Sequence, residues 1–110
     1  MPYTAFYARK SYIDTNKDVI KRFNNAINKG LEYVREHNDE EVANVIVDQF
    51  PDSSLNDVIS IVKRYRDNDS WLDNTSISED IYENLEDIMI NNDLLDSYVD
   101  FDKLVIDVNE

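Results

Sequence analysis

Three aspartates near the middle of the chain are of the residue type that binds hard cations. Asp67, Asp69 and Asp73 follow one another closely, and carboxylate oxygens are the ligands that calcium prefers. An EF-hand loop beginning at Asp67 would, however, need an oxygen ligand at Trp71 and a glycine at Leu72. The spacing therefore favours a solvated loop, and the sequence predicts no metal site and no other cofactor.

The single histidine, His37, lies at the end of a predicted helix. A protonated imidazole at that position meets the negative end of the helix dipole. The chain has no cysteine, and no serine stands in a nucleophile motif. No pair of its many carboxylates is distinguishable as an acid and a base. We therefore expect His37 to stabilise the helix end, and the sequence predicts no catalytic residue and no enzyme.

Aromatic residues gather at the beginning of the chain, at Tyr3, Phe6, Tyr7 and Tyr12. Packing in a core is the usual role of such residues. A tyrosine that lines a cleft would instead offer a flat apolar face and a hydroxyl group that orients a polar solute. The residues alone leave both interpretations open.

The elements expected to position these residues are one strand and four helices. The aromatic, β-prone segment predicts a strand over residues 3–8. Apolar residues at helical spacing, with Asn38 or Asp39 and with Ser54 as N-caps, predict the helices. Their expected bounds are about 17–36, 39–50, 55–66 and 78–91, followed by a tail over 94–110.

No other segment is a clear partner for the predicted strand, and residues 101–108 are only a weak candidate. A lone strand leaves a row of backbone donors and acceptors unpaired. We therefore expect residues 1–110 to form one partial domain of a larger protein whose sheet lies upstream. The exposed edge of residues 3–8 would also allow two copies to pair as a homodimer.

Charge is distributed unevenly along the chain. Residues 1–37 hold seven Lys/Arg and four Asp/Glu, a net charge of +3, whereas residues 38–110 hold four and twenty, a net charge of −16, which gives −13 in all. Such a chain repels nucleic acid and anionic membranes, so neither is an expected partner. The acidic residues are spread over several helices, which favours a solvated surface over a nucleic-acid mimic.

Two residues inside this arrangement need a structural explanation. Gly30 lies in the middle of a predicted helix, where glycine costs about 1 kcal/mol relative to alanine. A closely approaching backbone or a bend in the helix would account for it. Trp71 is expected to fill the gap between the helices at 55–66 and 78–91, or else to pack on a part of the protein upstream.

An ordered set of motifs resembles the last third of the solute-binding proteins of ABC importers, in their nitrate/sulfonate/taurine and thiamine-precursor branch. The motifs are PYTAFYARKSYI at 2–13, NAINKG at 25–30, EEVA at 40–43, FPD at 50–52, RY at 64–65, Trp71, ENLEDIM at 83–89 and VDFDKLV at 99–105. They follow one another in the family's order over nearly the whole chain.

This resemblance implies a mainly α, four-helix C-terminal fragment of a two-lobed α/β fold of the type II periplasmic-binding-protein kind, with one N-terminal strand. In the parent protein it implies non-covalent capture of a small solute, delivery to a membrane permease, and an extracytoplasmic, membrane-anchored lipoprotein whose signal is not in this sequence. Tyr3 and Thr4 are the ligand-binding candidates. The alternative is a free-standing acidic helical module for protein–protein interaction.

Overall fold

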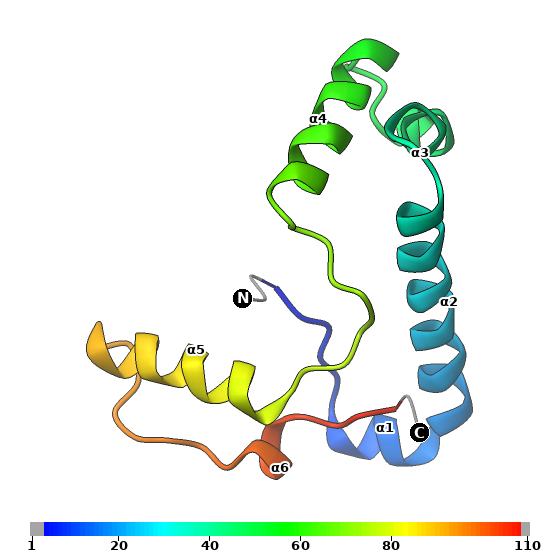
Figure 1. The fold of residues 1–110 in the computed structure, drawn as a ribbon. Helices are drawn as coiled ribbons and strands as arrows, with labels where there is room; N and C mark the ends of the chain where they lie inside the picture. The colour runs from blue at the N-terminus through cyan, green and yellow to red at the C-terminus, as the bar shows by residue number, and fades with distance from the viewer. Residues whose placement is uncertain (1–3, 109–110) are drawn as a thin grey trace. The chain divides into compact units, whose positions relative to one another are not determined.

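The computed structural model describes residues 4–108, and all regular structure among them is helical (Figure 1). The helices are α1 (Lys10–Thr15), α2 (Lys17–Glu36), α3 (Asp39–Ile46), the 3-10 helix η1 (Val47–Gln49), α4 (Leu55–Asp67), α5 (Glu79–Asn91) and α6 (Phe101–Leu104). The chain forms two compact units, Asn24–Thr75 and a second one of the residues before and after that segment. The helical class predicted from the sequence is confirmed.

The strand predicted over residues 3–8 is wrong for its described part. Residues 4–9 belong to no helix or strand, and residues 4–108 contain no β-structure. A strand gains its hydrogen bonds from a neighbour, and the weak candidate at 101–108 instead begins with α6. The high β-propensity of residues 4–8 therefore does not produce a strand, because no neighbouring strand is present among the described residues to form hydrogen bonds with it. Phe6 packs edge-on against Phe23 of α2, with ring centroids 4.9 Å apart, and Tyr7 is 97% exposed.

The starts of α3 and α4 follow from reciprocal capping. The side chain of Asn38 accepts a hydrogen bond from the Glu41 backbone N–H at 2.8 Å, and the Glu41 carboxylate accepts one from the Asn38 N–H at 2.9 Å. Ser54 and Asp57 make the same pair of bonds at 3.1 and 3.4 Å. Each exchange satisfies two of the backbone donors that a helix leaves open at its first turn.

The C-terminal ends of α4 and α5 are capped in the same way. Asp69 and Asp93 adopt left-handed backbone conformations, with φ of 51° and 57°. The following residues close the helices: the Ser70 N–H donates to the Tyr65 carbonyl at 2.9 Å, and the Leu94 N–H donates to the Met89 carbonyl at 2.8 Å. This is the Schellman arrangement, which glycine usually occupies. Here aspartate takes that position, and the chain's single glycine, Gly30, lies in α2.

The core of the unit Asn24–Thr75 lies between α3 and α4. Val42, Ala43, Val58 and Val62 are each at most 2% exposed. Half-buried apolar side chains surround them, among them Tyr33, Val34, Ile46, Val47, Ile59 and Trp71. Trp71 meets the Tyr65 ring edge-on at 5.7 Å. Trp71 thus packs against the core of α3 and α4, one helix earlier than the predicted gap.

A single arginine joins three helix ends in this unit. The Arg66 guanidinium donates to the Asp39 carboxylate at 2.7 Å, to the Val34 carbonyl at 2.8 Å and to the His37 carbonyl at 3.0 Å. The last turn of α2, the first residue of α3 and the last turn of α4 are therefore tied together. Charged donors at the carbonyl end of a helix also complement its dipole.

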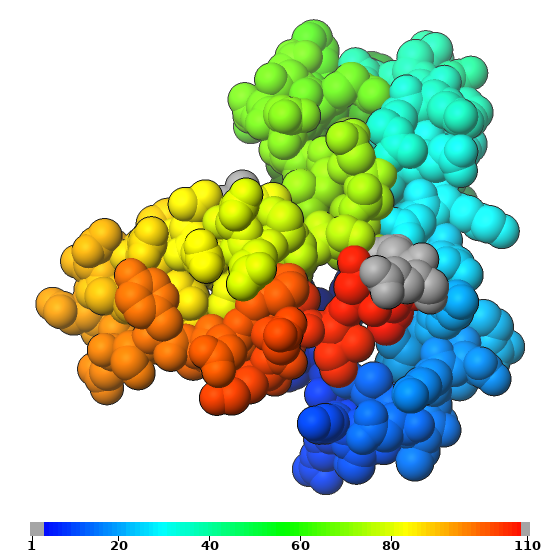
Figure 2. All heavy atoms as spheres, turned by 60° about the horizontal axis from the view of Figure 1, so that its bottom comes forward, coloured from blue at the N-terminus to red at the C-terminus, as the bar shows by residue number. Residues whose placement is uncertain are grey.

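The second unit is organised around α5 and the chain that follows it. Tyr82 and Glu86, one turn apart on α5, are 7% and 5% exposed. The Tyr82 hydroxyl donates to the Val99 carbonyl at 2.9 Å, and the Val99 N–H donates to the Glu86 carboxylate at 2.8 Å. Phe101 meets the Tyr82 ring edge-on at 5.4 Å. We call residues 94–104 the returning segment, and Figure 2 shows it, in orange, lying against α5, in yellow.

Helix α2 is amphipathic but has no buried residue. Its apolar stripe is only partly covered, and Val19 and Phe23 are 42% and 47% exposed. Gly30 has open space around it, because a methyl group added there would meet nothing within 4 Å among the described residues. The closely approaching backbone considered for Gly30 is therefore absent from the described part of the chain.

Candidate functional site

The two ligand-binding residues predicted from the sequence are not brought to a site by this structure. Tyr3 lies outside the described residues, and nothing follows for it. Thr4 is exposed in the non-helical segment that precedes α1. Both assignments remain predictions.

The aspartates considered for calcium have separate local roles. Asp67 forms an ion pair with Lys63 on the surface of α4, and Asp69 makes the left-handed turn after that helix. Asp73 lies further along, where its carbonyl accepts a hydrogen bond from Arg35. Across residues 4–108, no three His, Asp or Glu side chains converge in a way that would hold a metal ion.

His37 lies at the end of α2, where the sequence places it. Its ring stacks on that of Tyr33 with centroids 3.7 Å apart, and its Nδ1 is 2.9 Å from the Tyr33 carbonyl oxygen. An Nδ1–H group would donate to that oxygen, which also accepts the backbone N–H of His37 at 3.0 Å. This geometry suits a structural role at the helix end.

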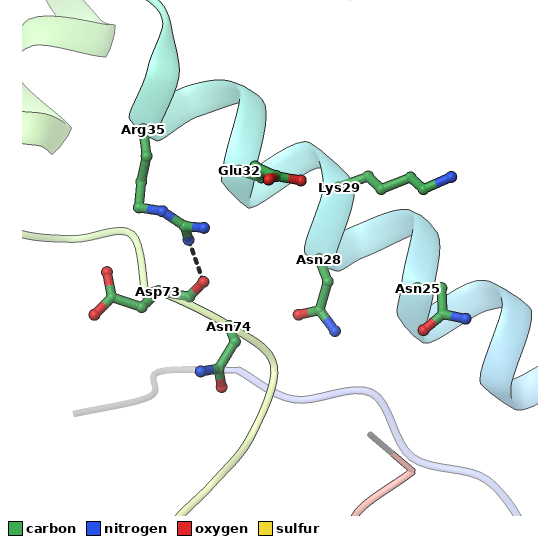
Figure 3. Close-up of a pocket in the computed structure, with 7 residues that line it drawn as sticks. All are labelled: Asn25, Asn28, Lys29, Glu32, Arg35, Asp73 and Asn74. Atoms are coloured by element: carbon green, nitrogen blue, oxygen red, sulfur yellow. Dashed lines mark hydrogen bonds between the residues drawn. The ribbon is translucent and has the colours of Figure 1, made fainter. Parts of the chain in front are cut away.

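A polar hollow of about 410 Å³ opens beside α2 (Figure 3). Its lining consists only of charged and amide side chains from α2 and from the loop after α4, namely Asn25, Asn28, Lys29, Glu32, Arg35, Asp73 and Asn74. All of these residues belong to the unit Asn24–Thr75. The hollow is thus formed within one compact unit.

Two hydrogen bonds hold the loop alongside the helix. Arg35 donates to the Asp73 carbonyl, and the Thr75 N–H donates to the Asn28 side chain at 2.9 Å. Arg35 and Asn28 are seven residues apart and so lie on the same face of α2, two turns from each other. The loop is therefore attached to α2 at two points, and the helix residue at each point lines the hollow.

The lining of this hollow is balanced in charge. Lys29 and Arg35 carry positive charges, Glu32 and Asp73 carry negative charges, and three asparagines supply amide donors and acceptors. Figure 3 shows Asn28 and Arg35 directed from α2 toward the loop, whereas Lys29 extends away from it. Such a lining suits a small polar molecule that makes hydrogen bonds and carries charges of both signs.

Sequence reasoning did not identify this hollow. Its α2 residues recur at helical spacing on one polar face, over Asn25, Asn28, Glu32 and Arg35, which is also the pattern of an ordinary solvated helix surface. The only further signal was a polar loop after α4, which contributes Asp73. Nothing in the sequence indicates that this loop runs alongside α2.

A second hollow, of about 580 Å³, lies beside α5 and the returning segment, and its lining is strongly acidic. Burial raises the pKa of the Tyr82 hydroxyl above its ordinary value, and the neighbouring Glu86 carboxylate raises it further. A hydrogen bond to Asp87, 2.7 Å long, raises the pKa of Tyr98 in the same direction. The lining carboxylates repel anions; they are Glu79, Glu83, Glu86, Asp87, Asp100 and Asp102.

Comparison with known proteins gives one curated relative. The "Putative binding protein YtlA" of Bacillus subtilis (strain 168) is 29% identical over 105 residues, which are 96% of this chain and 31% of that protein. The chain thus spans about a third of the length of the relative that it matches. No family model matches the chain, and no solved structure matches it significantly. The likeness supports a binding role.

Among residues 4–108, no helix has both the length and the apolar character needed to cross a lipid bilayer.

Proposed function

We propose that this chain forms the C-terminal part of an extracytoplasmic solute-binding protein of an ABC importer. The observation that carries the proposal is the likeness to a putative binding protein, which covers 96% of this chain but only 31% of the relative. The ordered motifs of the nitrate/sulfonate/taurine branch support the same assignment, because in that family they belong to the last third of the protein.

The apolar surface of the chain is consistent with a part that packs against more protein. Helix α2 is twenty residues long and buries none of them, although its apolar residues lie on one face. Phe6 and Tyr7, just before α1, are 80% and 97% exposed. Exposed apolar surface of this kind marks a place where another protein surface binds. In the proposed parent, that surface belongs to the rest of the lobe.

The proposed mechanism is capture by closure of two lobes. A solute that contacts both lobes favours the closed state by its additional contacts there, and the closed protein is the form that a membrane permease recognises. This chain would supply helices that brace a lobe. The solute contacts would come mainly from the rest of the protein, with Tyr3 and Thr4 as the candidates in this segment. The parent would be anchored outside the cytoplasmic membrane as a lipoprotein.

A chimera tests this proposal directly. In the Bacillus subtilis relative, the third that matches this chain is replaced by residues 1–110, and thermal unfolding is followed by calorimetry. We expect a single cooperative transition, because the exposed faces of α2 and the segment before α1 become covered. We also expect every solute that raises the Tm of the intact relative, from a panel of nitrate, alkanesulfonates and pyrimidines, to raise the Tm of the chimera.

Two results would count against the proposal. One is unfolding of the chimera in two independent transitions, with the transition of residues 1–110 unchanged from the separate chain. The other is detectable micromolar binding of a panel solute by the 110-residue chain alone, since capture would then need no second lobe. Two transitions together with specific recovery of a protein partner would favour the alternative, an acidic helical interaction module.

A further inference from the structure

We propose that the polar hollow between α2 and the loop at Asp73–Asn74 binds a short zwitterion, a molecule with a carboxylate at one end and an ammonium group at the other. This inference goes beyond the proposed function, because the hollow lies wholly within the unit Asn24–Thr75 and needs no other lobe. It rests on the arrangement of Arg35, Glu32 and the asparagines around one opening.

Arg35 provides the position for the carboxylate. A guanidinium group has five N–H donors in a planar fork, and the bond to the Asp73 carbonyl uses one N–H group and fixes the direction of the group. An anchored guanidinium loses less rotational freedom when it binds an anion than a freely moving side chain does. Asn28 and Asn74 border the same opening, and the Asn28 side chain accepts the Thr75 N–H at 2.9 Å.

Glu32 provides the position for the ammonium group. It precedes Arg35 by three residues, so the Cβ atoms of the two side chains are about 5–6 Å apart on one face of α2. A molecule with two methylene groups between its charged ends can reach both side chains at once. A simple anion would meet the carboxylate of Glu32, and a simple cation would meet the guanidinium of Arg35. The balanced lining therefore selects for a molecule with both charges.

The expected affinity is low. Arg35, Glu32 and Asp73 are exposed side chains, and water screens the attraction between exposed charges. A ligand of six non-hydrogen atoms can gain only a limited free energy. We therefore expect a dissociation constant on the order of 1 mM for β-alanine, the probe chosen here.

The test is a titration of the ¹⁵N-labelled 110-residue chain with β-alanine, followed by NMR. We expect saturable shifts of the Asn25, Asn28 and Asn74 side-chain amides. Propionate has only the carboxylate and propylamine has only the ammonium group, so each should bind at least about fivefold more weakly. Shifts that stay linear up to a concentration about fifty times the expected constant, or that are equal for the three probes, would overturn the proposal.

Two variants assign the binding to the hollow. Glu32→Gln keeps the size of the side chain and removes its charge, and it should weaken β-alanine binding by at least about fivefold without changing propionate binding. Glu36→Gln, one turn further along α2 and outside the lining, is the matched control and should leave β-alanine binding unchanged. Equal effects of the two substitutions would mean that the overall charge of α2, rather than the hollow, governs binding. All of these measurements stand whether or not the chimera unfolds as one unit.

Discussion

The Arg66 guanidinium lies 2.7 Å from the carboxylate of Asp39, so the last turn of α4 is bonded to the first residue of α3. The same guanidinium donates to the Val34 and His37 carbonyls at the end of α2. The core between α3 and α4 is small, and four of its side chains are fully enclosed. The hydrogen bonds of Arg66 to three helix ends therefore contribute strongly to how the helices of this unit are held together.

Replacement of Arg66 by alanine should lower the free energy of unfolding by about 1–2 kcal/mol. Hydrogen bonds to a charged group contribute about 1.5–3 kcal/mol each when well buried, and the partial exposure of this pair reduces that contribution. Urea denaturation followed by circular dichroism measures the change. Arg64→Ala is the matched control, because it removes the same charge from the same helix turn, and it should change stability by less than about 0.5 kcal/mol. Equal losses would show that charge alone matters there.

Replacement of Gly30 by alanine should stabilise the chain by about 1 kcal/mol. Alanine has the higher helix propensity, and the added methyl group meets open space. A higher Tm in calorimetry would show the gain, and the reverse change, Ala26→Gly, should cause a loss of similar size. A lower Tm for Gly30→Ala would mean that the position is crowded in solution. In the chimera, the same substitution reports whether another part of the protein approaches α2 at Gly30.

Glycine should be favoured over aspartate where the chain leaves α5 in a left-handed turn. We expect Asp93→Gly to raise the free energy of unfolding by about 0.5–1 kcal/mol, because only glycine adopts a φ of 57° without steric cost. Asp96→Gly removes a similar charge at a residue with ordinary φ and should not stabilise the protein. Denaturant midpoints of the two variants are compared, and a gain for Asp96→Gly alone would refute the assignment.

Stability should fall on the alkaline side, through Tyr82 and Tyr98. The pKa of each hydroxyl is raised in the folded state, so the folded protein keeps these protons after the unfolded chain begins to lose them near pH 10. Folding stability from these groups is therefore fully present below pH 10 and declines as the pH rises through the folded-state values. Tyr82→Phe should make this decline shallower. Urea midpoints measured from pH 8 to 11 test it, and an unchanged slope would contradict this account.

The sequence predicted the four longest helices, α2 to α5, well because their signals are local, whereas α1 and α6 were not among the predicted helices. Apolar spacing and capping residues such as Asn38 and Ser54 lie within the segments that they define, and α2 and α4 begin where these signals place them. The strand was predicted from propensity as well, but β-structure depends on a partner elsewhere in the chain. Residues 4–9 have no such partner among the described residues, so their propensity had no effect.

The candidate site could not be predicted for a related reason. Asn28 and Arg35 are recognisable on a polar face of α2, but the path of the loop at Asp73–Asn74 depends on contacts across more than thirty residues of sequence. The burial of Tyr82 and Glu86 was not predicted either, because the apolar residues of α5 at helical spacing are other residues, and these were expected to be the buried ones. Tyr82 and Glu86 are enclosed by backbone groups of a distant segment, which no local pattern reveals.

The hydrogen bonds of Tyr82 and Glu86 with the backbone of Val99 have a consequence for which substitutions this protein can accept in evolution. Both bonds go to the main chain of Val99, and its own side chain is 38% exposed. Selection should therefore tolerate almost any amino acid at position 99 except proline, which has no N–H group to offer the carboxylate. Substitutions of Tyr82 and Glu86 should be tolerated far less often, because each removes a hydrogen bond. In homologues that keep Tyr82 and Glu86, the residue at position 99 should therefore vary.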